Sequence, residues 1–406
     1  MHSMVERVAS QHFHQPRVLF VTTIPLTLTS FLLPFAEHLK AQGAQVDCAS
    51  LGASTAPGLS TFNNCFDINW SRSLSSLYNT HVINKQLHAI FDQGKYDLVH
   101  VHTPIASYLT RRALNTWKNA HKSTHPIVFY TAHGFHFYQG QKSLFKQSVF
   151  TYLERYAMRW TDVLITMNEE DERAARKLRG AAARPVIKRI DGVGFDFASY
   201  EPLKLAHIER QLSVDDLSDG SEQNTQPFIM TIIAELNENK SHALLFRALD
   251  VLKRRGITNW KLYVVGSGQL AEKLNELAHT LNLRTNIIFK GQLNKTDLAE
   301  IIRITDMGLL VSKREGLPRS LMELCAGGAL IAGTSTRGIR DEVRDPRALA
   351  LERTPEALAT MIDELMHDQP LRISIAQHQY DYARAHFDLE HILAEYDKLY
   401  SHYLFG

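Results

Sequence analysis

The sequence predicts an α/β protein of two doubly wound domains, each a parallel β-sheet with helices on both faces. Short runs of β-branched and apolar residues alternate with amphipathic segments along most of the 406 residues, which is the pattern of βα units. The strand-like runs are largely apolar, as expected for strands buried on both faces. A polar, acidic stretch at residues 208–226 interrupts this rhythm, and we interpret it as a surface insertion near a domain boundary.

The first half of the chain supplies the elements of one domain. Residues 1–16 show no sustained period, so we interpret them as an N-terminal extension. After them, apolar runs predict strands and amphipathic runs predict helices. The predicted strands are Val18–Thr22, Gln45–Ala49, Leu98–His102, Ile127–Thr131, Val163–Met167 and Val186–Ile190, and the predicted helices cover residues 29–42, 104–118, 145–159 and 169–178.

The second half repeats the pattern after residue 226. One face of a predicted helix over 241–254 carries Leu245, Leu249 and Leu252, which is the spacing of an amphipathic helix. The tail over 370–403 is predicted to be mostly helical. The predicted strands, with a helix after each, are Phe228–Ile233, Lys261–Val265, Ile287–Phe289, Met307–Val311 and Ala329–Ala332. A chain of this length supports about two such domains.

Composition excludes several classes of protein. Lys and Arg number 45 against 43 Asp and Glu, whereas a dedicated nucleic-acid binder carries a clear basic excess, so we expect no nucleic-acid partner. The three cysteines, Cys48, Cys65 and Cys325, are widely spaced and odd in number. They form neither a disulfide framework nor a zinc motif, which favours a reducing, cytoplasmic compartment.

One uncharged stretch, residues 18–36, has the length of a membrane-spanning helix. It contains several Thr and Ser residues and two prolines, Pro25 and Pro34. These residues favour a strand, a loop and the start of a helix at Thr29. A spanning or signal helix is the alternative.

The segment KREGLPRSLMEL, directly after the predicted strand Met307–Val311, is the strongest candidate for a site. Glu315 and Glu323 are separated by seven residues, and Pro318 suits the first turn of a helix that carries Glu323. The N-terminus of that helix and the amides of Gly316 and Leu317 favour anionic oxygens. Carboxylates form strong hydrogen bonds to hydroxyl groups, so the pattern suits a phosphorylated ligand rich in hydroxyls. The alternative is that both glutamates are merely solvated.

A second candidate is AELNENKSH, which follows the predicted strand Phe228–Ile233. Lys240 precedes a helix that Ser241 could cap. A lysine in this place can neutralise a diphosphate as a point charge. On spacing alone, a solvated surface lysine is an equal alternative.

A third candidate, TAHGFHFYQGQKS, follows the predicted strand Ile127–Thr131. Its aromatic and imidazole side chains suit stacking on sugars or contact with lipid; they are His133, Phe135, His136, Phe137 and Tyr138. Gly134, Gly140, Lys142 and Ser143 do not have the spacing of a phosphate-binding P-loop, which we therefore reject.

Two weaker patterns remain. His100 and His102 end a predicted strand, and with His133 and His136 they could suggest a metal site. No Asp-x-Asp motif or cysteine accompanies them, so we expect ordinary core or loop histidines and no metal. A lone Gly-x-Gly at Gly266 is weak evidence for a dinucleotide and suits equally a turn that lets backbone approach a ligand.

Taken together, these motifs resemble family four of the retaining glycosyltransferases with the GT-B fold, from Arg17 to about His402. REGLPRSLMEL matches that family's pattern of Glu, seven residues and Glu. TAHGFHFYQG, ERYAMRWTDVLITMNEED and NIIFKGQL are similar to a subgroup that adds sugars to polyprenyl-diphosphate-linked glycans. Those glycans serve bacterial capsule, O-antigen, lipopolysaccharide, exopolysaccharide or protein glycosylation.

The resemblance implies two Rossmann-like domains that face each other across a cleft. An acceptor-binding domain would cover residues 17–196, joined by residues 385–406 of a C-terminal helix that crosses back. A nucleotide-sugar-binding domain would cover residues 197–384.

The resemblance also implies roles for individual residues. Glu323 would hold the ribose hydroxyls and Glu315 the hydroxyls of the donor sugar, and Lys240 would contact the diphosphate. His133 would lie near the reaction centre. Many relatives carry an arginine where this chain has Glu235, which leaves the diphosphate to Lys240, helix dipoles and a second cation such as Arg319. Further donor contacts are implied for Gly316, Leu317, Pro318, Gly266, Gly291, Gln292 and Leu293, and acceptor contacts are expected for Phe135, His136, Phe137 and Tyr138.

The implied activity is transfer of a hexose or N-acetylhexosamine from a nucleotide-diphosphate sugar, expected to be UDP-linked, to a polyprenyl-diphosphate-linked glycan. Neither a metal nor another cofactor is expected. Phe145, Phe150, Lys142 and Lys146 would suit an anionic membrane surface, so we expect a cytoplasmic protein, peripheral on the inner face of the membrane; a buried helix face is the alternative. Alternative functions are a nucleotide-sugar epimerase of the same fold and a non-catalytic sugar-binding subunit, while no signature of a pyridoxal-phosphate phosphorylase is present. The sequence leaves the oligomeric state open.

Overall fold

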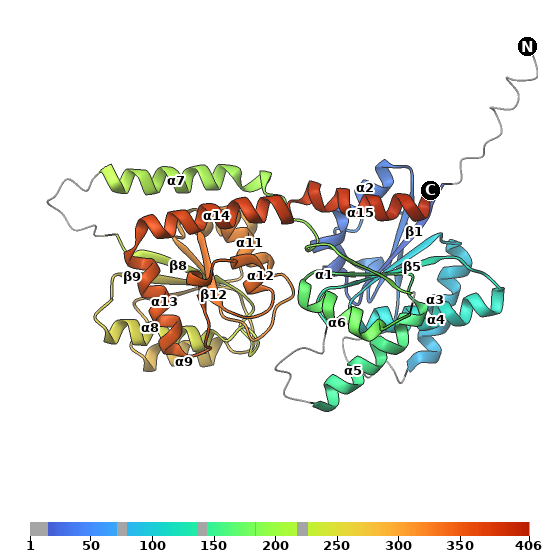
Figure 1. Cartoon of the computed structure of the whole chain (residues 1–406), viewed down its shortest axis with the longest axis horizontal. Coiled ribbons are helices and arrows are strands. Elements are labelled where there is room, and N and C mark those ends of the chain that lie inside the picture. Colours follow the sequence, from blue (N-terminus) through green and yellow to red (C-terminus); the bar gives the residue numbers. More distant parts are fainter. Residues whose placement is uncertain (1–14, 71–78, 136–143, 183, 217–225, 406) are drawn as a thin grey trace, which may run out of the picture. The chain divides into compact units, whose positions relative to one another are not determined.

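The computed structural model describes residues 15–70, 79–135, 144–182, 184–216 and 226–405, without the side chains of 144–147 and 212–216. The chain forms two compact units. The N-terminal unit comprises residues 1–193 and 393–406, and the C-terminal unit comprises residues 194–392. Both contain a parallel sheet with helices (Figure 1), which confirms the predicted fold class. The cleft expected between them stays a prediction.

The N-terminal unit is built on a seven-stranded sheet in the order β3-β2-β1-β4-β5-β6-β7, with all neighbours parallel. β1, β2, β4, β5 and β6 are almost wholly buried, which fits their largely apolar sequences. The strands are β1 (Arg17–Val21), β2 (Gln45–Ser50), β3 (Cys65–Asp67), β4 (Leu98–His102), β5 (Ile127–Ala132), β6 (Val163–Thr166) and β7 (Val186–Arg189).

Helices connect these strands. The predicted helix over 29–42 is instead a short helix α1 (Pro25–Thr27), a π-helical turn (Leu28–Leu32) and α2 (Leu33–Ala41). Pro34 has no backbone N–H, so it cannot continue the regular α-helical hydrogen bonds through this point. Helix α3 (Thr80–Gly94) was not predicted. The remaining helices are α4 (Pro104–His121), α5 (Leu144–Ala157) and α6 (Glu169–Arg179), with short 3₁₀ turns at Ala53–Thr55 and Met158–Trp160.

The C-terminal unit is built on a six-stranded parallel sheet in the order β10-β9-β8-β11-β12-β13. Its strands are β8 (Phe228–Ile233), β9 (Trp260–Val265), β10 (Ile287–Gly291), β11 (Met307–Leu310), β12 (Leu330–Thr334) and β13 (Leu349–Ala350). Its helices are α7 (Glu201–Asp216), α8 (His242–Arg254), α9 (Ala271–Thr280), α10 (Lys295–Ile304), α11 (Arg319–Ala326), α12 (Ile339–Val343), α13 (Pro355–His367) and α14 (Gln369–Phe387), with 3₁₀ turns at Ala198–Tyr200 and Pro346–Ala348.

The insertion expected at 208–226 does not begin as irregular chain. Residues up to Asp216 belong to helix α7, which packs beside α10. Within α7, His207 is buried beneath Gly328 and Arg210 forms an ion pair with Asp306. These contacts hold a polar sequence in helical form. Residues 217–225 lie outside the described part of the chain.

The chain passes from one unit to the other after Val193 and again after Ile392. The N-terminal unit ends at Val193 and not at 196, because Phe195 and Phe197 belong to the core of the C-terminal unit. The N–H of Phe195 donates to the carbonyl of Phe387 at 2.8 Å, and the N–H of Leu389 donates to the carbonyl of Phe195 at 3.0 Å. These bonds keep the chain around Asp388 with the C-terminal unit, so the chain rejoins the N-terminal unit at residue 393 and not at 385.

Helix α15 (Leu389–Leu404) returns the chain to the N-terminal unit, as predicted. The hydroxyl of Tyr400 lies 2.7 Å from His100 Nδ1, and that of Tyr396 lies 3.2 Å from Thr131 Oγ1. The ring of Tyr400 also stacks on Phe129. Strands β4 and β5 are therefore tied to the last helix by buried polar and aromatic contacts.

Residues 18–36 form a strand, a loop and a helix start, as expected. In the described residues, no helix combines the length and the apolar content needed to cross a membrane.

Candidate functional site

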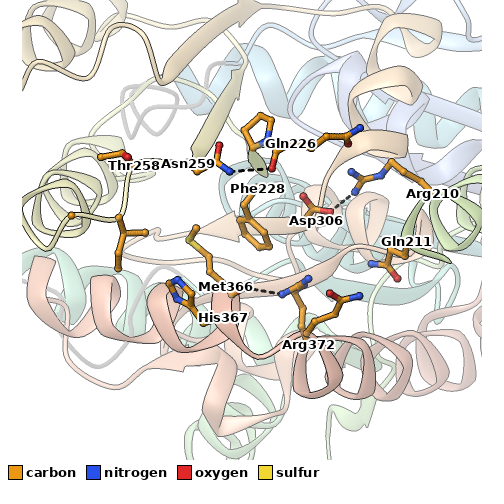
Figure 2. A pocket seen from close by; sticks show the side chains of 14 residues that line it. Arg210, Gln211, Gln226, Phe228, Thr258, Asn259, Asp306, Met366, His367 and Arg372 are labelled. Atoms are coloured by element: carbon orange, nitrogen blue, oxygen red, sulfur yellow. Dashed lines mark hydrogen bonds and ion pairs between the residues drawn. The ribbon is translucent and has the colours of Figure 1, made fainter. Parts of the chain in front are cut away.

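A hollow of about 750 Å³ lies at the amino ends of the strands in the C-terminal unit (Figure 2). Phe228 begins β8, Asn259 precedes β9 and Asp306 precedes β11, and all three line it. Two of the charged residues that line this hollow, Arg210 and Asp306, form an ion pair with each other. Ligands of open α/β sheets bind at the opposite, carboxyl ends of the strands. The candidate site therefore lies at that other edge.

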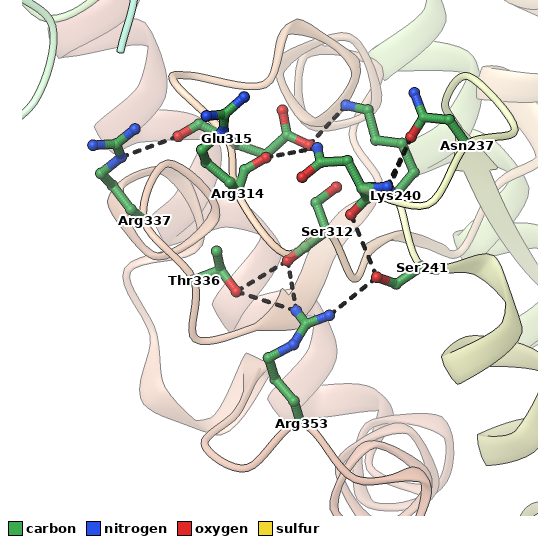
Figure 3. Close-up of polar contacts among 10 residues, drawn as sticks. Asn237, Lys240, Ser241, Ser312, Arg314, Glu315, Thr336, Arg337 and Arg353 are labelled. Atoms are coloured by element: carbon green, nitrogen blue, oxygen red, sulfur yellow. Dashed lines mark hydrogen bonds and ion pairs between the residues drawn. The ribbon is translucent and has the colours of Figure 1, made fainter. Parts of the chain in front are cut away.

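At the carboxyl edge, Lys240 and Glu315 form an ion pair (Figure 3). Lys240 Nζ donates a hydrogen bond of 2.7 Å to Glu315 Oε1. The side chains are 20% and 11% exposed, so water only partly screens their attraction. The structure thus brings together the two residues that the sequence placed after β8 and β11.

The loop that carries Lys240 is shaped by asparagines. Asn237 Oδ1 accepts hydrogen bonds from the N–H groups of Asn239 and Lys240, at 3.0 and 3.2 Å. Asn239 Nδ2 donates to the carbonyl of Arg314 at 2.9 Å, and the N–H of Lys313 donates to the carbonyl of Asn239 at 2.7 Å. The two bonds to Asn237 Oδ1 form a side-chain turn typical of asparagine. The two bonds of Asn239 fix the loop after β8 to the loop after β11.

Arg353 joins three loops at the same edge (Figure 3). Its Nη1 donates to the carbonyl of Ser312 at 2.6 Å and to Thr334 Oγ1 at 3.1 Å, and its Nη2 donates to Ser241 Oγ at 3.1 Å. Sequence reasoning missed Arg353, because its partners lie far away in the chain. Ser241, expected as a helix cap, makes no capping bond and adopts a left-handed conformation with φ of 56°.

Glycine is required where the loop after β12 meets the loop after β11. Gly338 has φ of 81°, and a Cβ there would lie 2.5 Å from the carbonyl oxygen of Gly316. Beside it, Arg337 Nε donates to the carbonyl of Glu315 at 3.3 Å. The backbone of Glu315 is therefore held from behind while its carboxylate faces Lys240.

Glu323 lies on the second turn of α11, as predicted. Pro318 is the N-cap of this helix, one position before the expected first turn. Arg319 Nε lies 3.4 Å from Glu323 Oε1. Burial raises the pKa of Glu323, and the charge of Arg319 acts in the opposite direction. Glu323 is thus a largely buried carboxylate that forms an ion pair with Arg319.

Gly266 and Gly291 lie on neighbouring strand ends. The N–H of Gly266 donates to the carbonyl of Gly291 at 2.8 Å. A Cβ on Gly266, whose φ is 137°, would lie 2.1 Å from the carbonyl oxygen of Ala234. The Gly-x-Gly turn therefore serves close packing of the loops after β8 and β9. Gln292 is exposed and Leu293 half-buried just beyond β10.

In the N-terminal unit, His133 follows β5. Its Nε2 lies 3.1 Å from Nδ1 of His102, the last residue of β4. Burial lowers the pKa of His133 to about 4. Both rings are therefore expected to be neutral at pH 7.

In the loop after His133, the expected acceptor contact of Phe135 is wrong. Phe135 is 1% exposed and belongs to the core, and its N–H donates to Asp171 Oδ1 at 3.4 Å. The structure thus places Phe135 in the core and not on an acceptor surface, because its apolar ring joins the buried hydrophobic cluster of the N-terminal unit. His136, Phe137, Tyr138 and Lys142 lie outside the described residues, as do the side chains of Phe145 and Lys146.

His100 is a core residue. Its Nδ1 bonds with Tyr400 and its Nε2 with Thr131 Oγ1 at 2.8 Å. Across the described ranges, no three His, Cys, Asp or Glu residues gather in a way that could hold a metal ion. Independence from a metal stays a prediction about the reaction.

Both halves of the chain match family models. Residues 17–168 match the model described as "Glycosyl transferase 4-like", and residues 213–383 match "Glycosyl transferases group 1". The two matches fall on the two units of the structure.

Individual relatives agree with these models. The chain is 30% identical to "Putative glycosyltransferase EpsD" of Bacillus subtilis, over 89% of this chain and 90% of that one. It is 24% identical to the "UDP-Gal:alpha-D-GlcNAc-diphosphoundecaprenol alpha-1,3-galactosyltransferase" of Escherichia coli, over 65% of this chain and 62% of that one. Among solved structures, Anabaena HepE in complex with UDP and glucose has a TM-score of 0.70 at 17% identity, covering 95% of this chain and 100% of that one. This last likeness supports the fold.

Proposed function

The chain belongs to family four of the GT-B glycosyltransferases, and from this premise we propose that it moves a hexose or N-acetylhexosamine from a UDP-sugar to a lipid-linked glycan. We further propose that the anomeric configuration is retained. The observation that carries the proposal is the contact of 2.7 Å between Lys240 and Glu315 at the carboxyl edge of the C-terminal sheet. The contact brings a cation next to a carboxylate, and we propose that the cation binds the diphosphate and the carboxylate the sugar hydroxyls.

The donor roles follow from the chemistry of each group. Lys240 would bind the diphosphate, Glu315 the sugar hydroxyls and Glu323 the ribose, while Gly291–Leu293 would border the base. Two features support these roles. The N-terminus of α11 begins directly after Glu315–Pro318, where backbone N–H groups favour anionic oxygens. Both glutamates are largely buried, which strengthens hydrogen bonds to a bound sugar.

The proposed chemistry needs no enzymatic nucleophile. The bond between C1 of the sugar and the phosphate oxygen breaks, and the acceptor hydroxyl forms a new bond to C1 from the same face. The acceptor's proton passes to the departing phosphate oxygen. Catalysis then depends on orientation and on stabilising the leaving diphosphate. Lys240 supplies positive charge there, and Glu235, where many relatives carry arginine, does not.

The proposed acceptor is a glycan on a polyprenyl diphosphate. The name of the Escherichia coli relative, which acts on such a lipid-linked substrate, supports this part. We assign the acceptor to the N-terminal unit and the donor to the C-terminal unit. His133 would act near the reaction centre from the N-terminal unit.

The direct test is a panel of nucleotide sugars with a polyprenyl-diphosphate-linked glycan, read by mass spectrometry. The proposal expects one mass increment of a hexose or N-acetylhexosamine with a UDP-sugar, and an α-linked product from an α-linked donor by NMR. Glu315→Ala should reduce the rate at least about 100-fold. Glu238→Ala is the matched control, because Glu238 lies in the same region, is 77% exposed and pairs only loosely with Lys313 at 3.5 Å.

The same panel separates the alternatives. Conversion of the UDP-sugar to its epimer without an acceptor would identify an epimerase, and binding of UDP without any turnover would identify a sugar-binding subunit. Inversion at C1 would contradict the retaining part alone.

A membrane-surface role is a separate part of the proposal. Flotation with vesicles containing anionic lipid should carry the protein upward, and Lys142→Glu with Lys146→Glu should abolish this binding. The same double variant should lose activity on acceptor in membranes. Absence of flotation together with full activity of the variant would contradict the role.

A further inference from the structure

His102 and His133 form a hydrogen-bonded imidazole pair at the carboxyl ends of β4 and β5. His102 Nδ1 and His133 Nε2 are 3.1 Å apart. One of these nitrogens must carry the proton that lies between them, and the other must accept it. The direction of this one bond decides which nitrogen of each ring is protonated.

The buried side of His102 decides the direction. Its ring is 1% exposed, and its Nε2 has no hydrogen-bond partner among the described residues. If His133 donated, His102 would carry its proton on Nε2 and bury an N–H group with no acceptor. If His102 donates from Nδ1, only a lone pair is left without a partner. Orphaned buried N–H groups are rarer in proteins than orphaned acceptors, so His102 is the donor.

We propose that His102 is a positioning residue that fixes His133 with its proton on Nδ1. This inference rests on the proposed function, in which His133 acts near the reaction centre. With Nε2 occupied by His102, His133 can offer only Nδ1–H to a ligand. It therefore donates a hydrogen bond to an oxygen of the substrate and does not act as a base.

The surroundings hold His102 in place. The ring of His100 lies 4.2 Å from that of His102, centroid to centroid, and is itself bonded on both nitrogens to Tyr400 and Thr131. The ring of Phe20 packs against both histidines, with ring centroids 5.9 Å from that of His102 and 5.5 Å from that of His100. Burial lowers the pKa of His102 and of His133, which keeps the pair neutral and preserves a single donor.

The remaining nitrogen of His133 is placed for contact with a ligand. His133 is half-buried, and its Nδ1 makes no hydrogen bond to any described residue. The ring of Phe31, from the π-helical turn, lies 6.2 Å away. Two residues further along the chain, the N–H of Phe135 donates a hydrogen bond to Asp171 Oδ1. The ring of His133 is thus anchored at Nε2 and bordered by a fixed backbone, while Nδ1 stays available.

Tautomers can be measured without turnover. Long-range ¹H–¹⁵N correlation spectra of the full chain, labelled with ¹⁵N-histidine, distinguish Nδ1–H from Nε2–H, and His133→Asn assigns the signals. We expect His133 to be neutral and protonated at Nδ1 at pH 7.5. A neutral Nε2–H form or an imidazolium would overturn the proposal.

Two substitutions of His102 provide a second test. Asn places an amide nitrogen close to the position of Nδ1 and can still donate to His133, whereas Leu cannot. His102→Leu should release the tautomer of His133 and lower kcat about 10-fold with a smaller change in KM for the donor, and His102→Asn should restore both. An unchanged tautomer and kcat in His102→Leu, or equal loss in His102→Asn, would overturn the proposal.

The two proposals can fail separately. If the wild-type protein transfers no sugar, the proposed function fails, yet the spectra still decide the tautomer. If His102→Leu does not fold, the wild-type spectrum and the Asn variant are sufficient, because both retain a donor at this position.

Discussion

Lys240 Nζ lies 2.7 Å from Glu315 Oε1, although the two residues are 75 positions apart in the chain. The groups proposed to bind the diphosphate and the adjoining sugar of the donor thus pair with each other in the donor-free protein. Under the proposed roles, a bound diphosphate would have to share or displace this bond to gain the full charge of Lys240. The Lys240–Glu315 pair is therefore balanced in charge without the donor, and under the proposed roles the affinity for a nucleotide would depend on that exchange.

The first prediction follows from this exchange. Glu315→Gln removes the carboxylate that competes for Lys240 but keeps the size of the side chain. UDP without a sugar should bind as tightly as to the wild type or a few-fold more tightly, whereas sugar transfer should fall at least about 100-fold. Isothermal titration calorimetry with UDP, beside initial rates, checks both parts.

Lys240→Met is the companion variant. It removes a hydrogen bond to a charged group, which is worth about 1.5–3 kcal/mol, so UDP should bind about 10- to 100-fold more weakly. Equal loss of UDP affinity in Glu315→Gln and Lys240→Met would show that the pair acts as one structural unit and would contradict the prediction.

The second prediction concerns the ribose. Glu323 has a side chain only 16% exposed and faces Arg319 at 3.4 Å. If its carboxylate binds ribose hydroxyls, the wild type should prefer UDP over its 2′- and 3′-deoxy analogues by about 10-fold. Glu323→Gln should weaken the binding of UDP and reduce the ratio of affinities for UDP and its deoxy analogues to about one. Displacement of a fluorescent UDP analogue measures all three ligands in one format.

Arg319→Gln separates the ribose contact from the local charge. It removes the neighbour of Glu323 and leaves the carboxylate, so the preference for the hydroxyls should persist. Loss of the preference in Arg319→Gln but not in Glu323→Gln would assign the ribose to Arg319 instead.

The fold was predictable wherever a short run of neighbouring residues is enough to indicate a buried strand or helix. β4 (Leu98–His102) and β8 (Phe228–Ile233) have the predicted bounds, because short and largely apolar runs are typical of strands buried on both faces of a sheet. Helix α3 was missed, although its buried residues Ile83, Leu87 and Ile90 have helical spacing. An explicit count of that period would have found it.

The site was predictable only in part, for a physical reason. Lys240, Glu315 and Glu323 lie directly after strands or on the following helix, so the βα pattern alone places them at one edge. Arg353 reaches Ser241 across 112 positions, and such a contact leaves no periodic trace in a single sequence. The core position of Phe135 was equally hidden, since the buried cluster that it joins is assembled from segments far apart in the chain.

The third prediction concerns the anchoring of helix α5. Arg111 is 1% exposed, and its Nη2 donates to Glu154 Oε2 at 3.0 Å, while the hydroxyl of Tyr130 donates to Oε1 at 3.1 Å. Arg111→Met leaves a buried carboxylate without its cation, which costs about 3–5 kcal/mol. Urea unfolding of the full chain should therefore show a large fall in the midpoint.

A double variant tests the cause of that loss. Arg111→Met with Glu154→Leu removes both charges, and replacing a buried pair by apolar groups is often neutral. The double variant should recover much of the stability. Arg176→Gln, which breaks an exposed pair with Glu172 on one helix, is the control and should cost about 0.5 kcal/mol or less. A double variant less stable than Arg111→Met would contradict the explanation.

The fourth prediction concerns pH and His242, the first residue of α8. Its side chain is 1% exposed, and neither ring nitrogen has a hydrogen-bond partner in the described chain. Burial, with a smaller contribution from the charge of Lys240, lowers its pKa from 6.5 to about 4. Between these values the unfolded chain binds more protons than the folded chain. Stability from this group is therefore full above pH 6.5 and is lost as the pH falls toward 4.

His242→Phe removes this titration and keeps an aromatic ring in the core. The variant should gain stability relative to the wild type by about 2 kcal/mol between pH 7 and pH 5, measured as the difference in urea unfolding free energy. Between pH 7 and pH 8 the difference should stay constant, because both states of the wild type are then neutral at this ring. A difference that is equal at pH 5 and pH 7 would mean that His242 is protonated to the same extent in the folded and unfolded chains. In that case the buried imidazole must have an acceptor for its proton that compensates for its burial.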